Sequence, residues 1–500
     1  MKRQIGIITA MTIAMTGMMA ISAPAIAAED ALAVVRTNIG SEPDNLHPWL
    51  SAASDTEAIF HNVFEGLVLF DETGAIVPGL AEDWEISEDG LTYTFYLRDD
   101  VTFHNGKEMT ADDVIYTFEA LSGLNGGDPL SSKFTSITSI EAEDDYTVVL
   151  TLEEANSAFL QYTRIAVLPE GYEEQSSSPV GTGPFVFSEY VPGQKVVLEK
   201  NEDYYEESRM PQIDKAEIYI MTDDSAVLNA MQAGQLDIAH VYSDNAEYIN
   251  GDFEIISAPQ NMVQLFAMNN SVEPFDDIRV RQAFEYVIDK QMIIDVVFAG
   301  YATEIYSNFS PVMSVYYNDE LTECYQPDVE KAKELMEEAG YEDGFEIIIK
   351  VPSNYPRHVD TAQVIAEQLK QINVSAKLEL VEWATWLEEV YSGADYETTI
   401  VGLTGKLDPN DILGRYVSDY GKNFFKYENE AYDELMEEAL TASEEERVEI
   451  YKECQKILTE DAAAVWISDP HQTVVVRSDL KGYTFYPLTF IDLSKLYYEE

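Results

Sequence analysis

Alternating apolar and polar residues in the first third of the chain indicate strands that bury one face. Residues 91–98 alternate apolar and polar side chains with the period of a half-buried β-strand, and residues 146–152 are rich in β-branched residues. Between them, Thr110 precedes an acidic turn and an apolar pattern of helical period that continues to Leu121. This region is therefore predicted to fold as strand, capped helix and strand.

The second half of the chain alternates helix and strand patterns. Asp277 and Asp328 are suited to cap helices, and Gly340 supplies the left-handed position that ends the second of these helices. Further elements are predicted in this order: a strand over 345–351, a helix over 359–369, a strand over 374–380, helices over 430–440 and 444–458, and a strand over 473–477. Alternating strands and helices are typical of α/β folds with parallel strand pairing. We predict a mixed α/β protein with more than one lobe.

The charge balance narrows the choice of partners. The 500 residues include 92 acidic and 30 basic side chains, a formal net charge of −62, and 46% of them are hydrophobic. Such a negative field repels nucleic acid and anionic membrane surfaces, so neither is expected as a partner. The length favours two or three packed domains. The acidity is typical of a solvated surface that salt screens, and it says nothing of the ligand.

The first residues have the pattern of a secretory signal peptide. Lys2 and Arg3 precede an apolar stretch over 5–21, and small residues surround Ala27, as in the three regions of such a segment. A retained membrane anchor is the alternative, but the stretch is shorter than the ~20 apolar residues that span a bilayer comfortably. No cysteine lies near the cleavage region. We predict an exported protein without a lipid anchor, resident in the periplasm.

Two cysteines, Cys324 and Cys454, would meet an oxidising compartment after export. Their spacing leaves two possibilities open. They could form a disulfide that closes a loop of about 130 residues, or they could remain two unpaired thiols, because spacing alone does not show whether their Cα atoms approach each other.

The motifs of the common exported hydrolases are missing from the chain. There is no G-x-S-x-G elbow, no H-E-x-x-H, no Gly-rich phosphate loop and no S-x-x-K paired with K-T-G. The six histidines include no pair four residues apart and no compact metal-site spacing. We therefore expect a protein that is not an enzyme and has neither a resident metal nor a cofactor. A secreted hydrolase that uses dispersed carboxylates stays open as an alternative from another class.

An ordered set of motifs resembles one family, the extracytoplasmic solute-binding proteins, family 5, of dipeptide, oligopeptide and nickel ABC importers. The motifs are Gly79–Trp84, Ser87–Gly90, Tyr93–Arg98, Val101–Gly106, Thr110–Val114, Pro179–Phe185, Asn201–Tyr205, Ala233–Asp237, Val280–Ala283 and Asp328–Tyr341. Each has a simple structural interpretation as a turn or as core packing. Their order along nearly all the mature chain carries the resemblance.

The resemblance implies an α/β, two-lobed, hinged periplasmic-binding-protein fold (type II) with an extra subdomain on the first lobe. It divides the chain into a signal peptide 1–28, first-lobe segments 29–73 and 179–261, a first-lobe subdomain 74–178, a second lobe 262–469 and a first-lobe return 470–500. A ligand that both lobes contact favours the closed state, and a shift from 1:99 to 99:1 takes about 5.5 kcal/mol of differential binding. The closed monomer is expected to be recognised by the transmembrane permease subunits.

The resemblance also indicates where a ligand binds. In peptide-binding members an aspartate in a Gly-rich segment before proline pairs with the peptide ammonium, and residues 402–409 place Asp408 at that point, with Leu403 and Gly405 in the same segment. Many relatives carry a tryptophan where Leu403 stands, so stacking there is in doubt. An Asp-Pro pair is also a common helix start, so a capping role for Asp408 is the alternative.

Aromatic and cationic candidates complete the expected site. Trp383 or Trp386 is expected either to wall the cleft or to pack in the core. A peptide carboxylate requires a cation, and Arg357, Arg164 and Arg415 are the candidates, each of which could instead pair with a surface carboxylate.

The sequence thus predicts a substrate-binding protein of an ABC importer that captures a short peptide and delivers it to the permease. A nickel- or metal-chelate-binding protein of the same family is the nearest alternative. No histidine lies between Thr361 and His471, which disfavours direct metal ligation beside Asp408.

Overall fold

The computed structural model describes residues 32–51, 53–241, 246 and 248–499. The predicted signal peptide, residues 1–28, lies outside this range. Within the described residues no helix is both long and apolar enough to cross a membrane.

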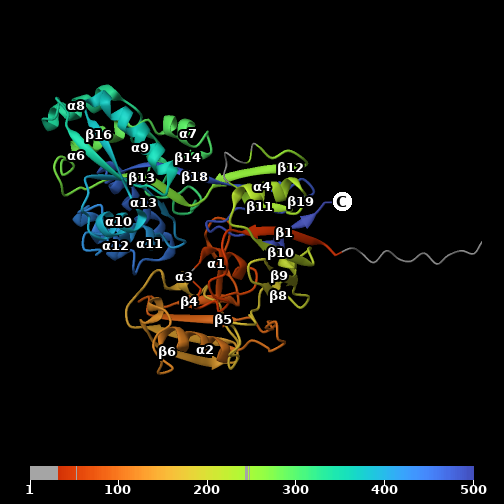
Figure 1. The fold of residues 1–500 in the computed structure, drawn as a ribbon. Coiled ribbons are helices and arrows are strands. Elements are labelled where there is room, and N and C mark those ends of the chain that lie inside the picture. The colour runs from red at the N-terminus through yellow and green to blue at the C-terminus, as the bar shows by residue number, and fades with distance from the viewer. Residues whose placement is uncertain (1–31, 52, 242–245, 247, 500) are drawn as a thin grey trace, which may run out of the picture. The chain divides into compact units, whose positions relative to one another are not determined.

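Two four-stranded sheets come from the first half of the chain (Figure 1). One has the order β1 (Val34–Ile39), β10 (Lys215–Ile220), β9 (Lys195–Lys200) and β8 (Phe185–Val191), with β1 parallel to β10. The other has the antiparallel order β4 (Ala81–Ile86), β5 (Thr92–Leu97), β7 (Thr147–Leu152) and β6 (Ile137–Asp144). Helix α2 (Ala111–Ser122) packs on β6 and β7. This second sheet falls inside the segment 74–178, whose status as a subdomain stays a prediction.

The alternating pattern of the first third is confirmed as predicted. Strands β5 and β7 both alternate partly buried and buried residues, so one face of each packs in the core. Helix α2 begins after Thr110 in a capping box with Asp113, and it ends at Gly123 in the left-handed region.

The largest sheet has the order β11 (Ile238–Val241), β18 (Ala464–Arg477), β13 (Met262–Met268), β17 (Thr398–Thr404), β15 (Glu346–Pro352) and β16 (Ser375–Val381). Strands β12 (Phe253–Pro259) and β14 (Ala302–Glu304) also pair with β18. β15 runs parallel to both β16 and β17, which confirms the predicted parallel pairing.

Strand β18 belongs to both parts of this sheet. Its first half pairs with β13 and β14, and its second half pairs with β11 and β12 (Figure 1). The strand predicted over 473–477 is therefore only the end of a longer one. The polar sequence Ser468-Asp469-Pro470 interrupts the apolar pattern that would have revealed the rest. The predicted second-lobe boundary after Asp469 lies within this strand and stays a prediction.

Helices cover the sheets and connect their strands. They are α1 (Ser54–Phe60), α3 (Phe159–Tyr162), α4 (Asp224–Gln232), α6 (Ile278–Val287), α7 (Lys290–Val297), α8 (Val329–Ala339), α9 (Pro356–Gln368), α10 (Trp383–Trp386), α11 (Pro409–Leu413), α12 (Glu430–Glu438) and α13 (Glu444–Glu460). A π-helical turn, Leu387–Ser392, continues α10. Short pairs β2 (Val68–Phe70) with β3 (Ile76–Pro78) and β19 (Leu480–Lys481) with β20 (Tyr497–Tyr498) complete the strands. Asp277 and Asp328 cap α6 and α8 as predicted.

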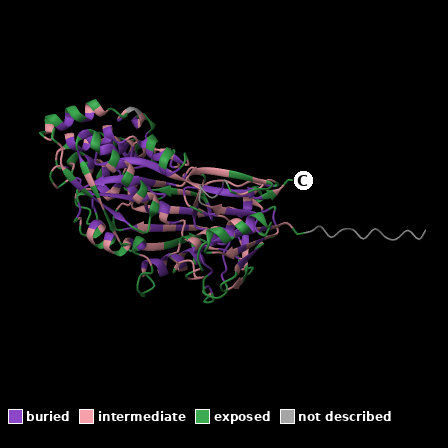
Figure 2. Ribbon diagram, turned by 45° about the horizontal axis from the view of Figure 1, so that its top comes forward, coloured by how far each residue is buried: buried purple, intermediate pink, exposed green. Residues whose placement is uncertain are grey.

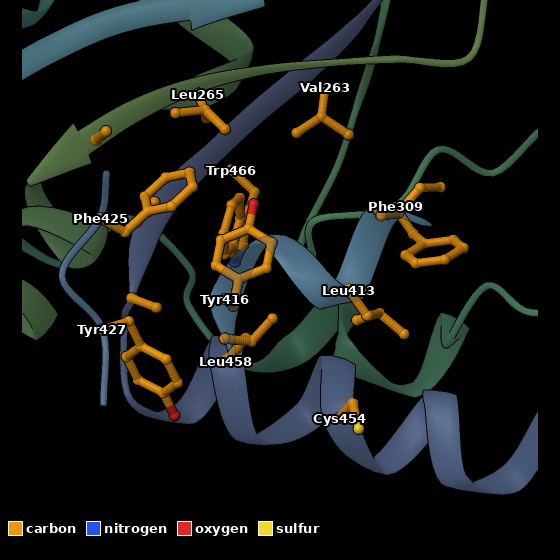
Figure 3. Close-up of a cluster of buried hydrophobic side chains, with 14 of the residues drawn as sticks. Val263, Leu265, Phe309, Leu413, Tyr416, Phe425, Tyr427, Cys454, Leu458 and Trp466 are labelled. Carbon is orange, nitrogen blue, oxygen red and sulfur yellow. The ribbon is translucent and has the colours of Figure 1, made fainter. Parts of the chain in front are cut away.

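The largest sheet has an apolar core on each face. Alternate residues of β13 divide between the two cores: Leu265 packs in one with Trp466, and Phe266 packs in the other. Figure 2 shows buried residues running along the strands, as expected for a sheet covered on both faces. In Figure 3 Tyr416 and Trp466 lie above helix α13, with Cys454 on the helix itself. Both Cys324 and Cys454 are free thiols.

One buried carboxylate, Glu65, contacts residues from two of the motifs that carry the resemblance, Pro179–Phe185 and Asn201–Tyr205. Glu65 is 3% exposed and accepts hydrogen bonds from the hydroxyls of Tyr204 (2.8 Å), Thr182 (3.1 Å) and Tyr205 (3.2 Å), while Arg209 forms an ion pair with it at 3.4 Å. Burial raises the pKa of Glu65. These two motifs therefore help to maintain the fold and do not by themselves indicate ligand contacts.

Candidate functional site

A cleft of about 860 Å³ opens where the strands of the sheets meet. One side is formed by Thr37 to Ile39 of β1, by Gly40 directly after this strand, and by Asp55 of α1. The floor is strand β18 at residues 470–473. The opposite side carries Tyr355 and Arg357 at the start of α9. Its size lies within the range of small-ligand sites, about 300–1,000 Å³.

The two predicted tryptophans, Trp383 and Trp386, have different positions at the aromatic wall of the cleft. Trp383 lines the cleft and stacks on Trp386 with ring centroids 5.0 Å apart and planes 4° apart, while Tyr355 meets Trp383 edge-on at 5.2 Å. Trp386 is 1% exposed and donates its indole N–H to Thr399 at 2.9 Å. Trp386 thus packs in the core and supports Trp383 from behind.

Of the three predicted arginines, Arg357 lines the cleft. Its guanidinium donates a hydrogen bond to the carbonyl of Val297. Arg415 donates to the carbonyl of Thr404 at 3.3 Å and is not among the lining residues. Arg164 lies beside Glu57 and Asp411, away from the lining, and burial lowers its pKa.

Asp408 is the N-cap of α11 and lies next to the cleft segment of β17. Its Oδ1 accepts the N–H of Asn410 at 2.7 Å, and the residue is 6% exposed. Burial raises the pKa of Asp408 to about 6, and the positive charge of Arg447 opposes that rise. Asp408 is not among the residues that line the cleft. The capping role, which the sequence left as the alternative, is present in the structure, and it does not exclude a ligand role.

The rest of the Gly-rich segment shows how tightly its backbone is held. Gly402 and Thr404 line the cleft, whereas Leu403 between them packs against a core on the other side of β17. Gly405 donates its N–H to the carbonyl of Asn261 at 2.6 Å, and a Cβ there would lie 2.0 Å from the Asn261 Oδ1. A glycine is required at 405 by this close approach.

Three of the six histidines line the cleft, and two have both ring nitrogens engaged. His358 Nε2 accepts the N–H of Gly402 at 3.1 Å, and its Nδ1 lies 3.1 Å from the amide nitrogen of Gln264. His471 bonds through Nδ1 to Ser257 at 3.2 Å and through Nε2 to Thr303 at 2.8 Å.

The third, His240, lies near Asp55, and burial lowers its pKa to about 4. His358 and His471 act as structural hydrogen-bonding groups. Within the part of the chain that the structure describes, no group of three His, Cys, Asp or Glu side chains is placed to hold a metal ion.

Several lining residues were not found from the sequence. Thr37–Gly40, Asp55 and His240 come from β1, α1 and β11, and no local pattern distinguishes them from other strand and helix residues. For Tyr355 the sequence contained one indication. This residue directly precedes Pro356, which starts α9, and it lies two residues before Arg357. The tertiary arrangement alone brings these segments to one cleft.

Comparison with known proteins gives a consistent result. The family model described as "Bacterial extracellular solute-binding proteins, family 5 Middle" matches residues 75–424. The di/tripeptide-binding protein 1 of Pseudomonas aeruginosa is 31% identical over 85% of this chain and 86% of that protein, and the dipeptide-binding protein of Escherichia coli is 29% identical over 89% and 91%. A periplasmic binding protein DppA from Helicobacter pylori, solved with the peptide STSA, superposes with a TM-score of 0.71 at 27% identity, covering 93% of this chain and 98% of that one.

These matches confirm the predicted two-lobed α/β fold of the periplasmic binding proteins. The family model spans more than half of the chain, and the relatives are covered over most of their length. The chain belongs to the bacterial extracellular solute-binding proteins of family 5.

Proposed function

We propose that this protein is the substrate-binding protein of an ABC importer, and that it captures a short peptide in the cleft and delivers it unchanged to the permease. The observation that carries the proposal is the cleft itself. It combines an aromatic wall at Trp383 and Tyr355, a cation at Arg357 and extended backbone at β1. Extended backbone, an aromatic surface and one cation suit the main chain, side chains and carboxylate of a peptide.

Each proposed ligand residue has a defined role. Arg357 binds the peptide carboxylate, Trp383 forms the wall for a side chain, and Asp408 pairs with the ammonium group. Asp408 is held at the start of α11, four residues after Thr404, the last residue of β17 that lines the cleft. Its approach to the ligand completes the closed state.

Export and assembly follow from the same proposal. The signal peptide 1–28 is removed, the mature chain resides in the periplasm without a lipid anchor, and it acts as a monomer that the permease subunits recognise. The relatives named di/tripeptide- and dipeptide-binding proteins support the peptide as cargo.

Native mass spectrometry followed by calorimetry tests the proposal. The purified mature protein is expected to retain short peptides from the expression host and to bind synthetic dipeptides to tetrapeptides, which are recovered intact. A metal chelate as the bound species, or a shortened peptide after incubation, would overturn it in favour of the chelate-binding or the hydrolase alternative.

A pair of variants tests the carboxylate site. Arg357→Gln should weaken peptide binding by about 2 kcal/mol or more, because one partner of an enclosed charge pair is lost. Arg415→Gln is the matched control and should bind like the native protein, since Arg415 does not line the cleft. Peptides amidated at the C-terminus lack the carboxylate, so Arg357→Gln and the native protein should bind them with the same affinity. If Arg415→Gln instead carries the loss, the carboxylate role passes to Arg415.

A further inference from the structure

Two chain segments cross side by side between the parts of the largest sheet. The first links β12 to β13 through Gln260 and Asn261, and the second is β18, which pairs with β12 from His471 onward and with β13 up to Ser468. The register shifts between Gln264 and Leu265, so the pairing is irregular close to this crossing. In a hinged two-lobed protein, such crossing segments absorb the change in backbone angles on closure.

Asp469 lies on β18 at the crossing and is fully buried, with 0% exposure. Its Oδ1 accepts the N–H of Gln260 at 3.0 Å, and its Oδ2 accepts the hydroxyl of Ser310 at 2.5 Å. The backbone amides of Asn261 and Met262 also contribute to the stabilisation of its charge. Successive N–H groups directed at one carboxylate form an anion-binding nest. Among the described residues no Lys or Arg forms an ion pair with Asp469.

The crossing segment that Asp469 organises is in contact with the segment proposed to bind the ligand. Asn261 is 1% exposed, has φ of 59°, and accepts the N–H of Gly405 at 2.6 Å. Its side chain donates to the carbonyl of Pro487 at 3.1 Å. Gly405 precedes Asp408 by three residues, so a chain of hydrogen bonds runs from the buried carboxylate through the crossing backbone to the loop.

We propose that Asp469 is a positioning residue for ligand capture, whose ionised carboxylate holds the crossing segment Gln260–Met262 and through it the loop Gly405–Asp408. This inference rests on the proposed function. An ionised carboxylate binds N–H donors more strongly than a neutral acid does. The loop is therefore better ordered, and the ligand more tightly bound, when Asp469 is ionised.

Burial without an ion pair raises the pKa of Asp469 to about 7, while the hydroxyl of Ser310 and the backbone amides oppose the rise. The nearest titratable side chain along β18 is His471, held by Ser257 and Thr303, and burial lowers its pKa, so its ring is neutral near pH 7. On the paired strand β14 the ionisable residue is Glu304, which lies opposite Ser468, while Thr303 lies opposite Asp469. Since the bound state favours the ionised form, ligand binding releases part of a proton when the pH is near 7.

Peptide affinity measured against pH for the native protein and Asp469→Asn tests the coupling. Asparagine reproduces the neutral acid: its oxygen accepts from Gln260 and its amide donates to Ser310. At about pH 8.5, well above the carboxyl pKa of about 7, the native protein should bind about tenfold more tightly than Asp469→Asn. The peptide affinities of the native protein and Asp469→Asn should become equal at about pH 5.5. Asp408 titrates in both proteins, so the ratio of affinities removes the part of the pH dependence that the two proteins share.

Two further variants separate positioning from simple structural support. Ser310→Ala removes one donor to the carboxylate, so the midpoint of the affinity ratio should move to higher pH. Asp328→Asn, an exposed cap on α8 where asparagine caps as well as aspartate, should keep the native profile. A ratio that stays constant from about pH 5.5 to about pH 8.5, or a midpoint that Ser310→Ala leaves unmoved, would overturn the proposal.

Hydrogen exchange of the unliganded proteins tests positioning without any ligand. At about pH 8.5 the amides of Gln260 and Gly405 should exchange about tenfold faster in Asp469→Asn than in the native protein, and equally fast at about pH 5.5. Equal exchange at both values would contradict the role of Asp469. A failure of the proposed function is distinct, because the native protein would then bind no peptide at any pH while the exchange difference persisted.

Discussion

At the scale of single residues, Asp408 combines a structural role with its proposed ligand role. Its Oδ1 caps α11, yet burial raises its pKa to about 6, well above the ordinary value of 3.8. A carboxyl whose folded pKa is raised stabilises the fold most below its unfolded pKa, and this contribution is lost as pH rises through about 6. At neutral pH, the protein thus maintains a charge here at a cost in stability.

Replacement of Asp408 by serine separates the two roles. Serine keeps the cap and removes the charge, so peptide binding should weaken by about 2 kcal/mol or more, as when a buried ion loses its partner. At pH 8 the thermal midpoint should stay the same or rise, because the buried charge is gone. Asp408→Ala should show the same loss of binding and be about 1 kcal/mol less stable than Asp408→Ser, because the cap is lost as well. Unchanged calorimetric affinity in Asp408→Ser would remove this residue from the site.

Glu65 is a second buried carboxylate, with a purely structural environment. Truncation of Glu65 to alanine leaves the hydroxyls of Tyr204 and Thr182 and the guanidinium of Arg209 without their shared acceptor. The free energy of unfolding in urea should fall by about 3 kcal/mol or more. Tyr205→Phe removes one donor only and should cost about 1 kcal/mol. A loss in Glu65→Ala no larger than that in Tyr205→Phe would show that the network is not cooperative.

Residue identity alone could not distinguish the predicted tryptophans or arginines. Trp383 and Trp386 lie on one helix turn, yet one faces the cleft and the other donates its N–H inside the core. Arg357 and Arg415 are also of one residue type, yet Arg357 lines the cleft and Arg415 does not. The sequence provided the residue types that a peptide site requires, whereas the direction of each side chain depends on packing between segments far apart in the chain.

At the scale of elements, local signals were sufficient wherever caps and periodicity agreed. Helix α8 begins after Asp328, whose side chain accepts the N–H of Lys331, and ends at Gly340 in the left-handed region, as the sequence predicted. Strand β18 was only partly predicted, because its middle is specified by pairing with β12, β13 and β14 and not by its own apolar pattern. The cleft floor lies in this middle part, so sequence patterns could not locate it.

Gly340 gives a test of the helix stop that was predicted from the sequence. Its φ is 86°, and an added Cβ would meet nothing within 4 Å, so Gly340→Ala is strained by backbone conformation alone. It should lower the free energy of unfolding by about 1 kcal/mol. Gly414→Ala is the matched control, since Gly414 also has open space around it but has φ of −55°. Equal stability of the two variants would contradict the strain argument.

At the scale of the whole molecule, the acidic surface sets the conditions for stability. The 500 residues carry a formal net charge of −62. Folding brings these like charges into a smaller volume than they occupy in the unfolded chain, so their mutual repulsion destabilises the folded state. Many exposed ion pairs lie three residues apart on one helix, such as Lys333 with Glu330, and contribute little each. The excess negative charge of the carboxylates is therefore not neutralised by these ion pairs. Screening by salt has to reduce the repulsion between the carboxylates.

Thermal unfolding as a function of salt tests this dependence. The Debye length falls from about 10 Å at 0.1 M salt to about 3 Å at 1 M, so repulsion between surface carboxylates is largely removed. The thermal midpoint should rise by several degrees between these concentrations of sodium chloride. Tetramethylammonium chloride at equal ionic strength controls for specific sodium binding and should give the same rise if screening is the cause. A midpoint that stays constant or falls would show that the surface charge costs no stability, and a rise with sodium alone would assign the effect to bound cations.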